Sequence, residues 1–363
     1  MIRAVRLLDH RWALTAPAAS ARATWTKRRA LLLVLEDAAG NLGLGEAAPL
    51  PGFSSDSWEE VQRALRALLG RELPTRDEER ACSMDLRHAS AVAAPPAARA
   101  ALEAALLDLW ARQADVPAWS LLAGDHAPSN VPLAAWLPDG TEAALEAAHA
   151  AHGHGLRAFK VKLDGQRGLE SGIATLRALR SAFGREVALR ADANQSATLA
   201  ALEPHLGALR ELELEWLEEP TAERLSKSLG VPLALDESLA TTTGFPELAG
   251  QADVAALVLK PTALGGFGRA LGLAEHARAH HCKCVASHAL EGPVGFMAAA
   301  TLALALPEGP AHGLGAYGRV AEGPPPPALP AGRAHLVRWE AAGFGLSLEE
   351  ALAGTQVDAT EQA

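Results

Sequence analysis

The 363-residue chain has few aromatic side chains, few cysteines and no concentration of positive charge. Aromatic residues make up 4% of it, with a single tyrosine, so alanine and leucine must fill most of the core. Three cysteines, an odd number, do not suit a disulfide framework and fit a reducing compartment. The formal charge of −10 is spread without a basic run, which argues against nucleic acid or an anionic membrane as a partner.

Long apolar runs are also missing. The longest, residues 293–306, is shorter than the roughly 20 residues that a membrane-spanning helix needs. The first 14 residues mix arginines with short apolar pieces and lack the continuous apolar core of a signal peptide. We therefore expect a cytoplasmic protein with no membrane partner, long enough for two domains, whose oligomeric state the sequence leaves open.

The first part of the chain predicts a small α+β domain. Residues 2–8, 30–35 and 42–47 are typical of antiparallel strands, with a turn at 39–41. The polar stretch 15–29 between the first two strands is expected to be a mobile loop. Ser57 and Glu60 have the spacing of a capping box at the start of an amphipathic helix, and a second helix is expected over 97–113.

From about residue 131 short apolar runs alternate with helical stretches rich in alanine and leucine, which indicates βα units and a parallel sheet. An open doubly wound sheet usually carries a glycine-rich phosphate loop after an early strand, and none is present, so a barrel is favoured. A proline run at 324–327 precedes a strand and a short helix expected within 336–353. The eight strands expected are 132–137, 158–163, 187–193, 213–218, 232–237, 255–260, 284–288 and 312–316.

Five of these strands end in a charged residue, namely Lys162, Asp192, Glu218, Asp236 and Lys260. The carboxyl ends of parallel barrel strands meet at one face, so three carboxylates and two ammonium groups would point at one place. An isolated Asp-Glu-Ser is most often a helix N-cap, but three successive strands that each end in a carboxylate favour a metal site. Three oxygen ligands with further positions open suit Mg²⁺ rather than Zn²⁺.

The lysines suggest proton transfer. Lys160 and Lys162 are two residues apart, which puts both side chains on the same face of a strand. Like charge and burial both lower the pKa of a lysine, so one of the pair is a candidate neutral base; two solvated lysines on an exposed strand are the alternative. Lys260 would stand on the opposite side of the barrel, where a second base would face a metal-bound carboxylate substrate.

Several other residues are candidates for substrate binding. Arg190 and Asn194 alternate with Asp192, so all three would face the barrel interior and would need partners there. Ser287 and His288 follow the seventh strand, and the glycines of the eighth would let a substrate carboxylate approach backbone N–H groups, although loop geometry explains these four equally well. The full set is Lys160, Arg190, Asn194, Ser287, His288, Gly313 and Gly315.

Taken in order, the motifs Lys-x-Lys, Asp-Ala-Asn, Glu-Glu-Pro, Asp-Glu-Ser and Leu-Lys-Pro resemble those of the enolase superfamily, in its muconate-lactonizing and mandelate racemase-like part. The resemblance covers nearly the whole chain. It implies an α/β fold, a modified TIM barrel of (β/α)7β type over residues 126–323, with an α+β capping domain built from 1–125 and 324–363. It also implies Mg²⁺, with Mn²⁺ as a substitute, held by Asp192, Glu218 and Asp236, and a lysine base that forms an enediolate.

Within the superfamily, residues 45–54 (GEAAPLPGFS) are similar to the capping segment of the o-succinylbenzoate synthases, as are Arg190 and residues 287–295. This implies a lyase for the syn dehydration of 2-succinyl-6-hydroxy-2,4-cyclohexadiene-1-carboxylate to 2-succinylbenzoate in menaquinone biosynthesis, with Lys162 as base and Lys260 as a cation. The Asp-x-Asp pattern of dipeptide epimerases is replaced by Gly313-Leu314-Gly315. The alternative is an N-succinylamino acid racemase or dipeptide epimerase that uses both lysines as acid and base.

Overall fold

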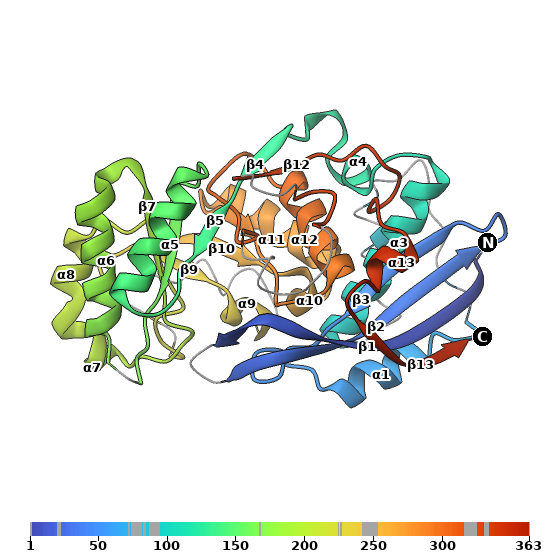
Figure 1. The fold of residues 1–363 in the computed structure, drawn as a ribbon, viewed down its shortest axis with the longest axis horizontal. Coiled ribbons are helices and arrows are strands. Elements are labelled where there is room, and N and C mark those ends of the chain that lie inside the picture. The colour runs from blue at the N-terminus through green and yellow to red at the C-terminus, as the bar shows by residue number, and fades with distance from the viewer. Residues whose placement is uncertain are drawn as a thin grey trace.

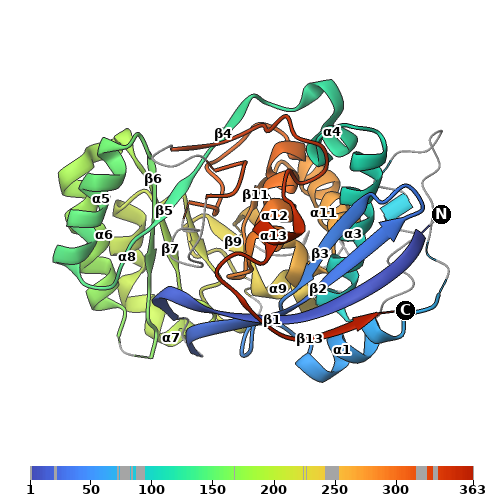
Figure 2. The same ribbon diagram turned by 45° about the vertical axis from the view of Figure 1, so that its right-hand side comes forward.

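The structure, a computed structural model, describes residues 2–19, 23–71, 73, 82, 85–86, 95–166, 168–223, 225, 227–241, 253–315, 325–329 and 334–362. A curled parallel sheet with helices around it lies beside an antiparallel sheet that contains both ends of the chain (Figures 1 and 2). We call the antiparallel sheet with its helices the cap, and the parallel sheet with its helices the barrel.

The cap sheet has the strand order β13-β1-β2-β3, with antiparallel pairing throughout. Its strands are β1 (Ile2–Ala19), β2 (Thr24–Asp37), β3 (Leu42–Ala47) and β13 (Gln356–Gln362). Helix α1 (Trp58–Arg66) begins with the predicted capping box, since Ser57 and Glu60 each bond the other's backbone. Helix α3 (Pro96–Gln113) is confirmed as well, and most of its side chains are buried.

The mobile loop predicted over residues 15–29 is wrong. Strand β1 continues to Ala19 and β2 begins at Thr24, and Ala18 pairs with Trp25 near the end of this long hairpin. Only residues 20–22 of that stretch lie outside the described part of the chain. Apart from Trp25 its side chains are small or polar, so no apolar alternation marked the strands, and the backbone pairing of β1 with β2 continues into this stretch.

Two glycines bring β3 unusually close to α3. A Cβ atom on Gly45 would lie 1.8 Å from the carbonyl oxygen of Ala101, and one on Gly43 would lie 2.2 Å from that of Ala105. Any side chain at these positions would push the helix away from the sheet. The close approach places the end of β3, and the segment that follows it, against the barrel.

The barrel sheet has seven parallel strands in sequential order from β5 to β11. They are β5 (Ala134–Trp136), β6 (Ala158–Lys162), β7 (Ala188–Asp192), β8 (Trp216–Glu218), β9 (Leu233–Leu235), β10 (Val254–Leu259) and β11 (Lys283–Ala286). Of the expected eighth strand, 312–316, the last residue lies outside the described part of the chain, and the pairing of residues 312–315 is limited to two parallel bridges, His312 with Leu133 and Gly313 with Ser287, which close the gap between β5 and β11. The predicted fold class is confirmed.

Helices cover the outside of the barrel sheet (Figure 1). They are α5 (Thr141–Gly153), α6 (Glu170–Phe183), α7 (Leu199–Leu202), α8 (Leu206–Glu211), α9 (Glu237–Thr241), α10 (Pro261–Leu264), α11 (Phe267–Ala279) and α12 (Pro293–Ala305). Short 3₁₀ turns stand at Gly124–His126, Gly184–Glu186 and Glu203–His205.

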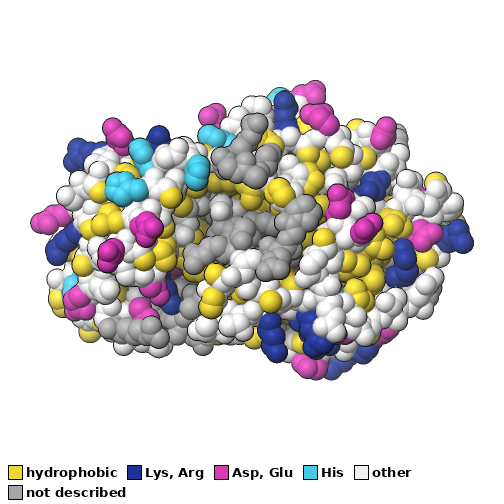
Figure 3. Space-filling model, in the orientation of Figure 1, with side chains coloured by type: hydrophobic (Ala, Val, Ile, Leu, Met, Phe, Trp, Pro, Cys, Tyr) yellow, Lys and Arg dark blue, Asp and Glu magenta, His cyan; other side chains and the backbone are white. Residues whose placement is uncertain are grey.

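The last part of the chain runs back along the barrel to the cap. Strand β12 (His335–Val337) pairs with β4 (Asn130–Pro132), and β13 then forms the edge of the cap sheet beside β1. The short helices α4 (Ala118–Ala123) and α13 (Leu348–Ala351) complete the described elements. None of the helices in the described ranges is long and apolar enough to cross a membrane. Acidic and basic side chains are interspersed on the face seen in Figure 3, without a patch of one sign.

Candidate active site

The strand register builds the site in two layers. Lys162, Asp192 and Glu218 are paired across β6, β7 and β8 at their carboxyl ends. Two residues earlier, Lys160 and Arg190 are paired, as are Arg190 and Trp216. Because side chains on a strand alternate between faces, both layers point to the same side of the sheet. They line one cavity of about 140 Å³ at the carboxyl ends of the strands.

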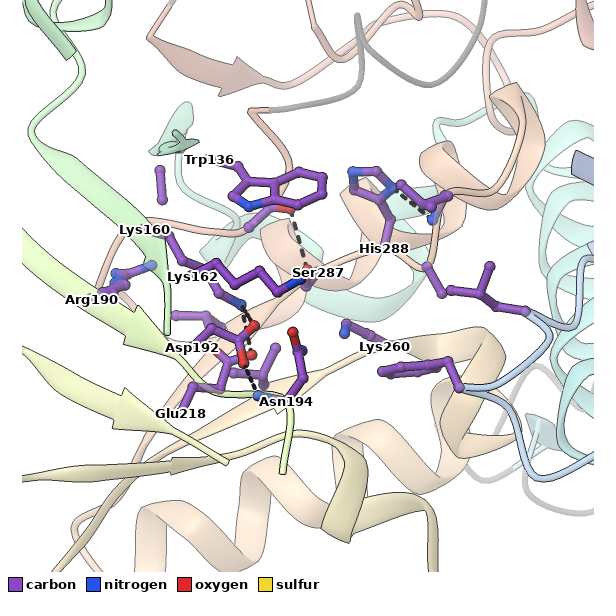
Figure 4. A pocket seen from close by; sticks show the side chains of 18 of the residues that line it. Trp136, Lys160, Lys162, Arg190, Asp192, Asn194, Glu218, Lys260, Ser287 and His288 are labelled. Atoms are coloured by element: carbon purple, nitrogen blue, oxygen red, sulfur yellow. Dashed lines mark hydrogen bonds and ion pairs between the residues drawn. The ribbon is translucent and has the colours of Figure 1, made fainter. Parts of the chain in front are cut away.

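Most of the predicted site residues meet in this cavity (Figure 4). Asp236 is buried beside it and is held by Lys260. Gly315 is not among the residues that line it; a Cβ there would lie 2.5 Å from the carbonyl oxygen of Ala134, so this glycine serves close packing of the backbone. The predicted residues that line the cavity are Lys160, Lys162, Arg190, Asp192, Asn194, Glu218, Lys260, Ser287, His288 and Gly313.

Lys160 bridges two of the predicted metal ligands. Its Nζ lies 2.6 Å from Oδ2 of Asp192 and 2.8 Å from Oε1 of Glu218. Burial by itself would lower the pKa of Lys160, but the nearby carboxylates outweigh it and raise that pKa above its usual value. The sequence analysis expected burial and crowding to lower the pKa of one lysine of the pair, and Lys160 is not that lysine, because the carboxylates of the neighbouring strands raise its pKa. Lys160 is an ammonium ion, which leaves Lys162 as the candidate base on this strand.

Lys260, the residue that follows β10, faces the same cavity and contacts Asp236. Its Nζ also lies 4.2 Å from the centre of the Phe53 ring, which comes from the cap. Burial acts to lower the pKa of Lys260, and Asp236 and Glu237 raise it by more. Figure 4 shows Lys260 reaching the cavity from the side opposite Lys160 and Lys162.

The carboxylates are strongly perturbed. Burial raises the pKa of Glu218 to about 8 and that of Asp236 to about 7, although Lys160 and Lys260 act in the opposite direction. Asp192 and Asp236 add to the shift of Glu218, so the three acidic side chains are close enough to repel one another. Buried carboxylates that repel one another need a cation near them.

No group of three or more His, Cys, Asp or Glu side chains in the described ranges already has the geometry of a metal site. Instead, ammonium groups face the three carboxylates, Lys160 between Asp192 and Glu218 and Lys260 at Asp236. The donors are all carboxylate oxygens, the type that Mg²⁺ prefers. The donor set and its excess of negative charge thus fit Mg²⁺, provided that the ammonium groups shift when the ion binds.

Glu219, which the sequence analysis did not single out, ties the ligand-bearing strand ends together. Its Oε1 accepts hydrogen bonds from the backbone N–H groups of Asp236 and Ser238, at 2.7 and 2.8 Å. Its Oε2 accepts from the side chains of Gln195 and Ser238, at 2.8 Å each. The two glutamates of the Glu-Glu-Pro motif therefore have different roles: Glu218 faces the cavity, and Glu219 fixes the loops after β7 and β9.

Arg190 lies deep in the site and has spare hydrogen-bonding capacity. It is 3% exposed, and its Nε and Nη1 donate to Oε2 of Glu215 and to the carbonyl of Ala311, each at 2.7 Å. Its guanidinium stacks 4.0 Å above the ring of Trp216. Within the described ranges, neither Arg190 Nη2 nor Trp216 Nε1 has a hydrogen-bond partner, and both residues line the cavity. This is a donor-rich, desolvated corner suited to an anion.

The cap supplies an apolar part of the cavity wall, which the sequence analysis did not place in the site although it singled out residues 45–54. Trp25, Leu50 and Phe53 come from the β1–β2 hairpin and from the segment after β3. Trp25 is anchored by a hydrogen bond of 3.0 Å from its Nε1 to the carbonyl of Pro51. Aromatic residues are rare in this chain, so Trp25 and Phe53 in the cap were a usable signal, but only the fold brings them to the barrel.

Both parts of the chain match known families. Residues 2–123 match the mandelate racemase / muconate lactonizing enzyme N-terminal domain, and residues 142–352 match the enolase C-terminal domain-like family. An N-succinylamino acid racemase of Thermus thermophilus is 33% identical over 273 residues, 69% of each chain. The chloromuconate cycloisomerase CbnB of Cupriavidus necator is 29% identical, over 79% of this chain and 80% of that one.

A dipeptide epimerase from Methylococcus capsulatus, solved in complex with Mg and a dipeptide, has a TM-score of 0.79 and is 26% identical, with 95% of this chain and 99% of that one covered. The resemblance inferred from the motifs is confirmed at the level of the superfamily, and its finer assignment to a dehydratase is not. With both domain families matched over most of its length, the chain belongs to the enolase superfamily and is an enzyme of that superfamily.

Proposed function

We propose that the protein is a racemase of N-acylated amino acids, with N-succinylamino acids as the substrate class. The observation that carries the proposal is the position of Lys162 and Lys260, which line one cavity from β6 and from β10 on its opposite side (Figure 4). Inverting a carbon next to a carboxylate requires a base on one face and an acid on the other. Two lysines on either side of a carboxylate cluster meet that requirement.

The two lysines exchange roles with the enantiomer. Lys162 removes the α-proton from one enantiomer while Lys260, as an ammonium ion, returns a proton to the opposite face, and the reverse holds for the other enantiomer. Asp192, Glu218 and Asp236 would hold Mg²⁺, which when bound offsets the negative charge that develops on the substrate carboxylate. Lys160, which contacts Asp192 and Glu218 in the structure and would shift when the ion binds, adds a second positive charge at that end of the site.

The far end of the cavity suits a succinyl group. Arg190 Nη2 and Trp216 Nε1 are buried donors without a partner within the described ranges, and both residues line the cavity, so a carboxylate bound in this corner would lie near unpaired donors. The apolar surfaces of Leu50 and Phe53 suit the methylene groups of an acyl chain and an amino acid side chain. The 33% identical relative named an N-succinylamino acid racemase supports the same choice.

Dehydration to o-succinylbenzoate is the rival activity. It starts with the same proton abstraction by Lys162 and is favoured by the similarity of residues 45–54 to that family. The relatives above are a racemase, a cycloisomerase and an epimerase, which support the isomerase alternative better. The lack of an Asp-x-Asp pattern at 313–315 favours an N-succinyl substrate over a dipeptide.

The test is an assay of the purified enzyme with N-succinyl-L- and N-succinyl-D-amino acids in ²H₂O, and with the cyclohexadiene substrate, each with Mg²⁺ and with chelator. We expect racemisation with deuterium at the α-carbon. Lys162→Ala and Lys260→Ala should each abolish racemisation, by more than about 10²-fold, and each should still exchange the α-proton of one enantiomer only. Lys283→Ala, at an exposed lysine of β11, is the matched control. Aromatisation without racemisation would refute the proposal.

A further inference from the structure

Arg28 joins the cap to the barrel beside the cavity. It lies on β2, is 4% exposed, and donates hydrogen bonds to carbonyl groups on both sides of the domain boundary. On the cap side, its Nη2 and Nη1 donate to Ala48 and Pro49 at 2.6 and 3.1 Å. On the barrel side, its Nε and Nη2 donate to Leu290 and Ala289 at 3.0 and 3.4 Å. One guanidinium thus holds two backbone segments together.

Both segments form walls of the cavity. The cap segment continues into Leu50 and Phe53, and the barrel segment contains His288, Ala289 and Leu290, all of which line the cavity. Leu290 has φ of +59°, a conformation that non-glycine residues rarely adopt and that its surroundings must enforce. The bond from Arg28 to its carbonyl and the bond of 3.2 Å from its N–H to Nδ1 of His288 provide that constraint.

Glu46 makes a second tie across the same boundary. It is 3% exposed at the end of β3, and its two oxygens accept hydrogen bonds from the N–H groups of Gly292 and Gly295, at 2.6 and 2.9 Å. These N–H groups belong to the N-terminus of helix α12, which has no side-chain cap of its own. A carboxylate from the cap therefore performs the capping that the local sequence of α12 does not supply.

We propose that Arg28 and Glu46 form an interdomain clamp that sets the width of the substrate cavity, and that both are positioning residues for the reaction. The proposal rests on the proposed function only for the choice of substrate. None of the hydrogen bonds of the clamp involves Asp192, Glu218, Asp236 or the lysines. The clamp therefore acts on the fit of the acyl group and side chain, rather than on metal binding or proton transfer.

Arg28 is suited to this role because a planar guanidinium can serve four acceptors at once, whereas an ammonium has three donors on one point. Arg28→Met keeps most of the volume but removes the donor of four carbonyl groups, three of them in buried hydrogen bonds. Arg28→Lys keeps the charge and part of the bonding. Glu46→Gln keeps the shape, but its NH₂ group must face one of the two N–H donors at the start of α12.

The kinetic arm measures KM and kcat for the racemisation of an N-succinylamino acid. In Arg28→Met we expect KM to rise about tenfold or more while kcat changes less than KM, with Arg28→Lys in between. Ethylguanidinium added to Arg28→Ala should restore part of kcat/KM. Mg²⁺ affinity should stay within about twofold of the wild-type value in all variants. Arg11→Met, at an exposed cap arginine paired with Asp358, is the control and should leave both parameters unchanged.

The second arm needs no substrate. Hydrogen exchange of peptides covering residues 288–296 should be faster by about tenfold in Arg28→Met and in Glu46→Gln than in Arg11→Met. Exchange and KM equal to the control in both Arg28 variants would overturn the clamp, as would a loss of kcat without a change in KM. If the wild type racemises no N-succinylamino acid, the proposed function fails while exchange still decides the clamp. If Arg28→Met does not fold, the kinetic and hydrogen-exchange measurements are made on Arg28→Lys and Glu46→Gln instead.

Discussion

Replacing Lys160 by methionine tests the charge balance of the site. In the wild type, two ammonium groups, Lys160 and Lys260, face three buried carboxylates. Methionine has a similar length but no charge, so Asp192 and Glu218 both lose the cation that lies within 3 Å of them. The variant should therefore be less stable than the wild type when metal is absent, and it should bind Mg²⁺ more tightly.

The size of the effect follows from burial. Removing one partner of a buried ion pair costs about 3–5 kcal/mol. The side chain of Lys160 is 25% exposed, which reduces the cost, and Glu218, with a pKa of about 8, can take up a proton near neutral pH, which reduces it further. We expect about 3 kcal/mol at pH 8, which for a chain of 363 residues lowers Tm by about 4 °C.

Magnesium should reverse the loss. A ligand at a hundred times its Kd stabilises the folded state by about 2.7 kcal/mol. In the wild type the ion must displace the ammonium of Lys160 from two carboxylates, whereas in Lys160→Met those oxygens are already free of it. Thermal unfolding at pH 8 in EDTA measures the loss of stability without metal, and the rise of Tm with increasing Mg²⁺ measures the stabilisation by the ion. Lys283→Met is the control for loss of an exposed lysine. Equal Tm values in EDTA, or a smaller Mg²⁺-induced rise in Lys160→Met than in the wild type, would refute the reasoning.

Three further predictions concern other parts of the structure. Glu219→Gln should weaken Mg²⁺ binding about 10- to 100-fold in a calorimetric titration, because an amide cannot accept all four hydrogen bonds that Glu219 accepts; unchanged affinity would contradict this. Burial, with Arg190 nearby, lowers the pKa of His312 from 6.5 to about 3. Between these pH values the histidine is therefore protonated in the unfolded chain but neutral in the folded one. Stability should therefore fall by up to about 5 kcal/mol as pH drops from about 6.5 towards 3, and urea unfolding of His312→Asn should show a flatter pH dependence. Gly45→Ala should lower the free energy of unfolding by about 3 kcal/mol because its Cβ would lie 1.8 Å from the Ala101 oxygen, whereas Gly153→Ala, with no atom within 4 Å, should be neutral; similar Tm values for both would count against the close approach.

The barrel part of the site could be predicted from the sequence because it depends on local patterns. A short apolar run that ends in a charge marks the carboxyl end of a strand, and parallel strands bring such ends together without further information. Lys162, Asp192, Glu218 and Lys260 were placed in one cavity on that basis alone. The eighth strand was overestimated, because an apolar run predicts an extended segment but not how many of its residues pair.

The cap contribution was missed for the opposite reason. Trp25 reaches the cavity only because a hairpin forms where the sequence suggested a loop, and Phe53 only because β3 packs close to α3. The local pattern also left open which lysine of the pair has the raised pKa, since the two carboxylates that contact Lys160 stand 32 and 58 residues further along the chain. Contacts between segments far apart in the sequence decide these features. The local hydrophobic periodicity that predicts helices and strands carries no information about such contacts.

The charged residues at the strand ends and the residues that form the cavity walls are held in place by different contacts. This difference bears on how the activity can change. The carboxylates and lysines stand at the ends of paired strands, and Glu219 locks two of the loops after them with four hydrogen bonds. The cap-side walls of the cavity belong to a hairpin, to the segment after β3 and to a strained loop at Leu290, joined through Arg28 and Glu46. A substitution in the walls should therefore change which substrate fits while proton transfer stays intact, and a substitution at a strand end should do the reverse. Substrate choice in this enzyme is for that reason to be sought at the boundary between cap and barrel.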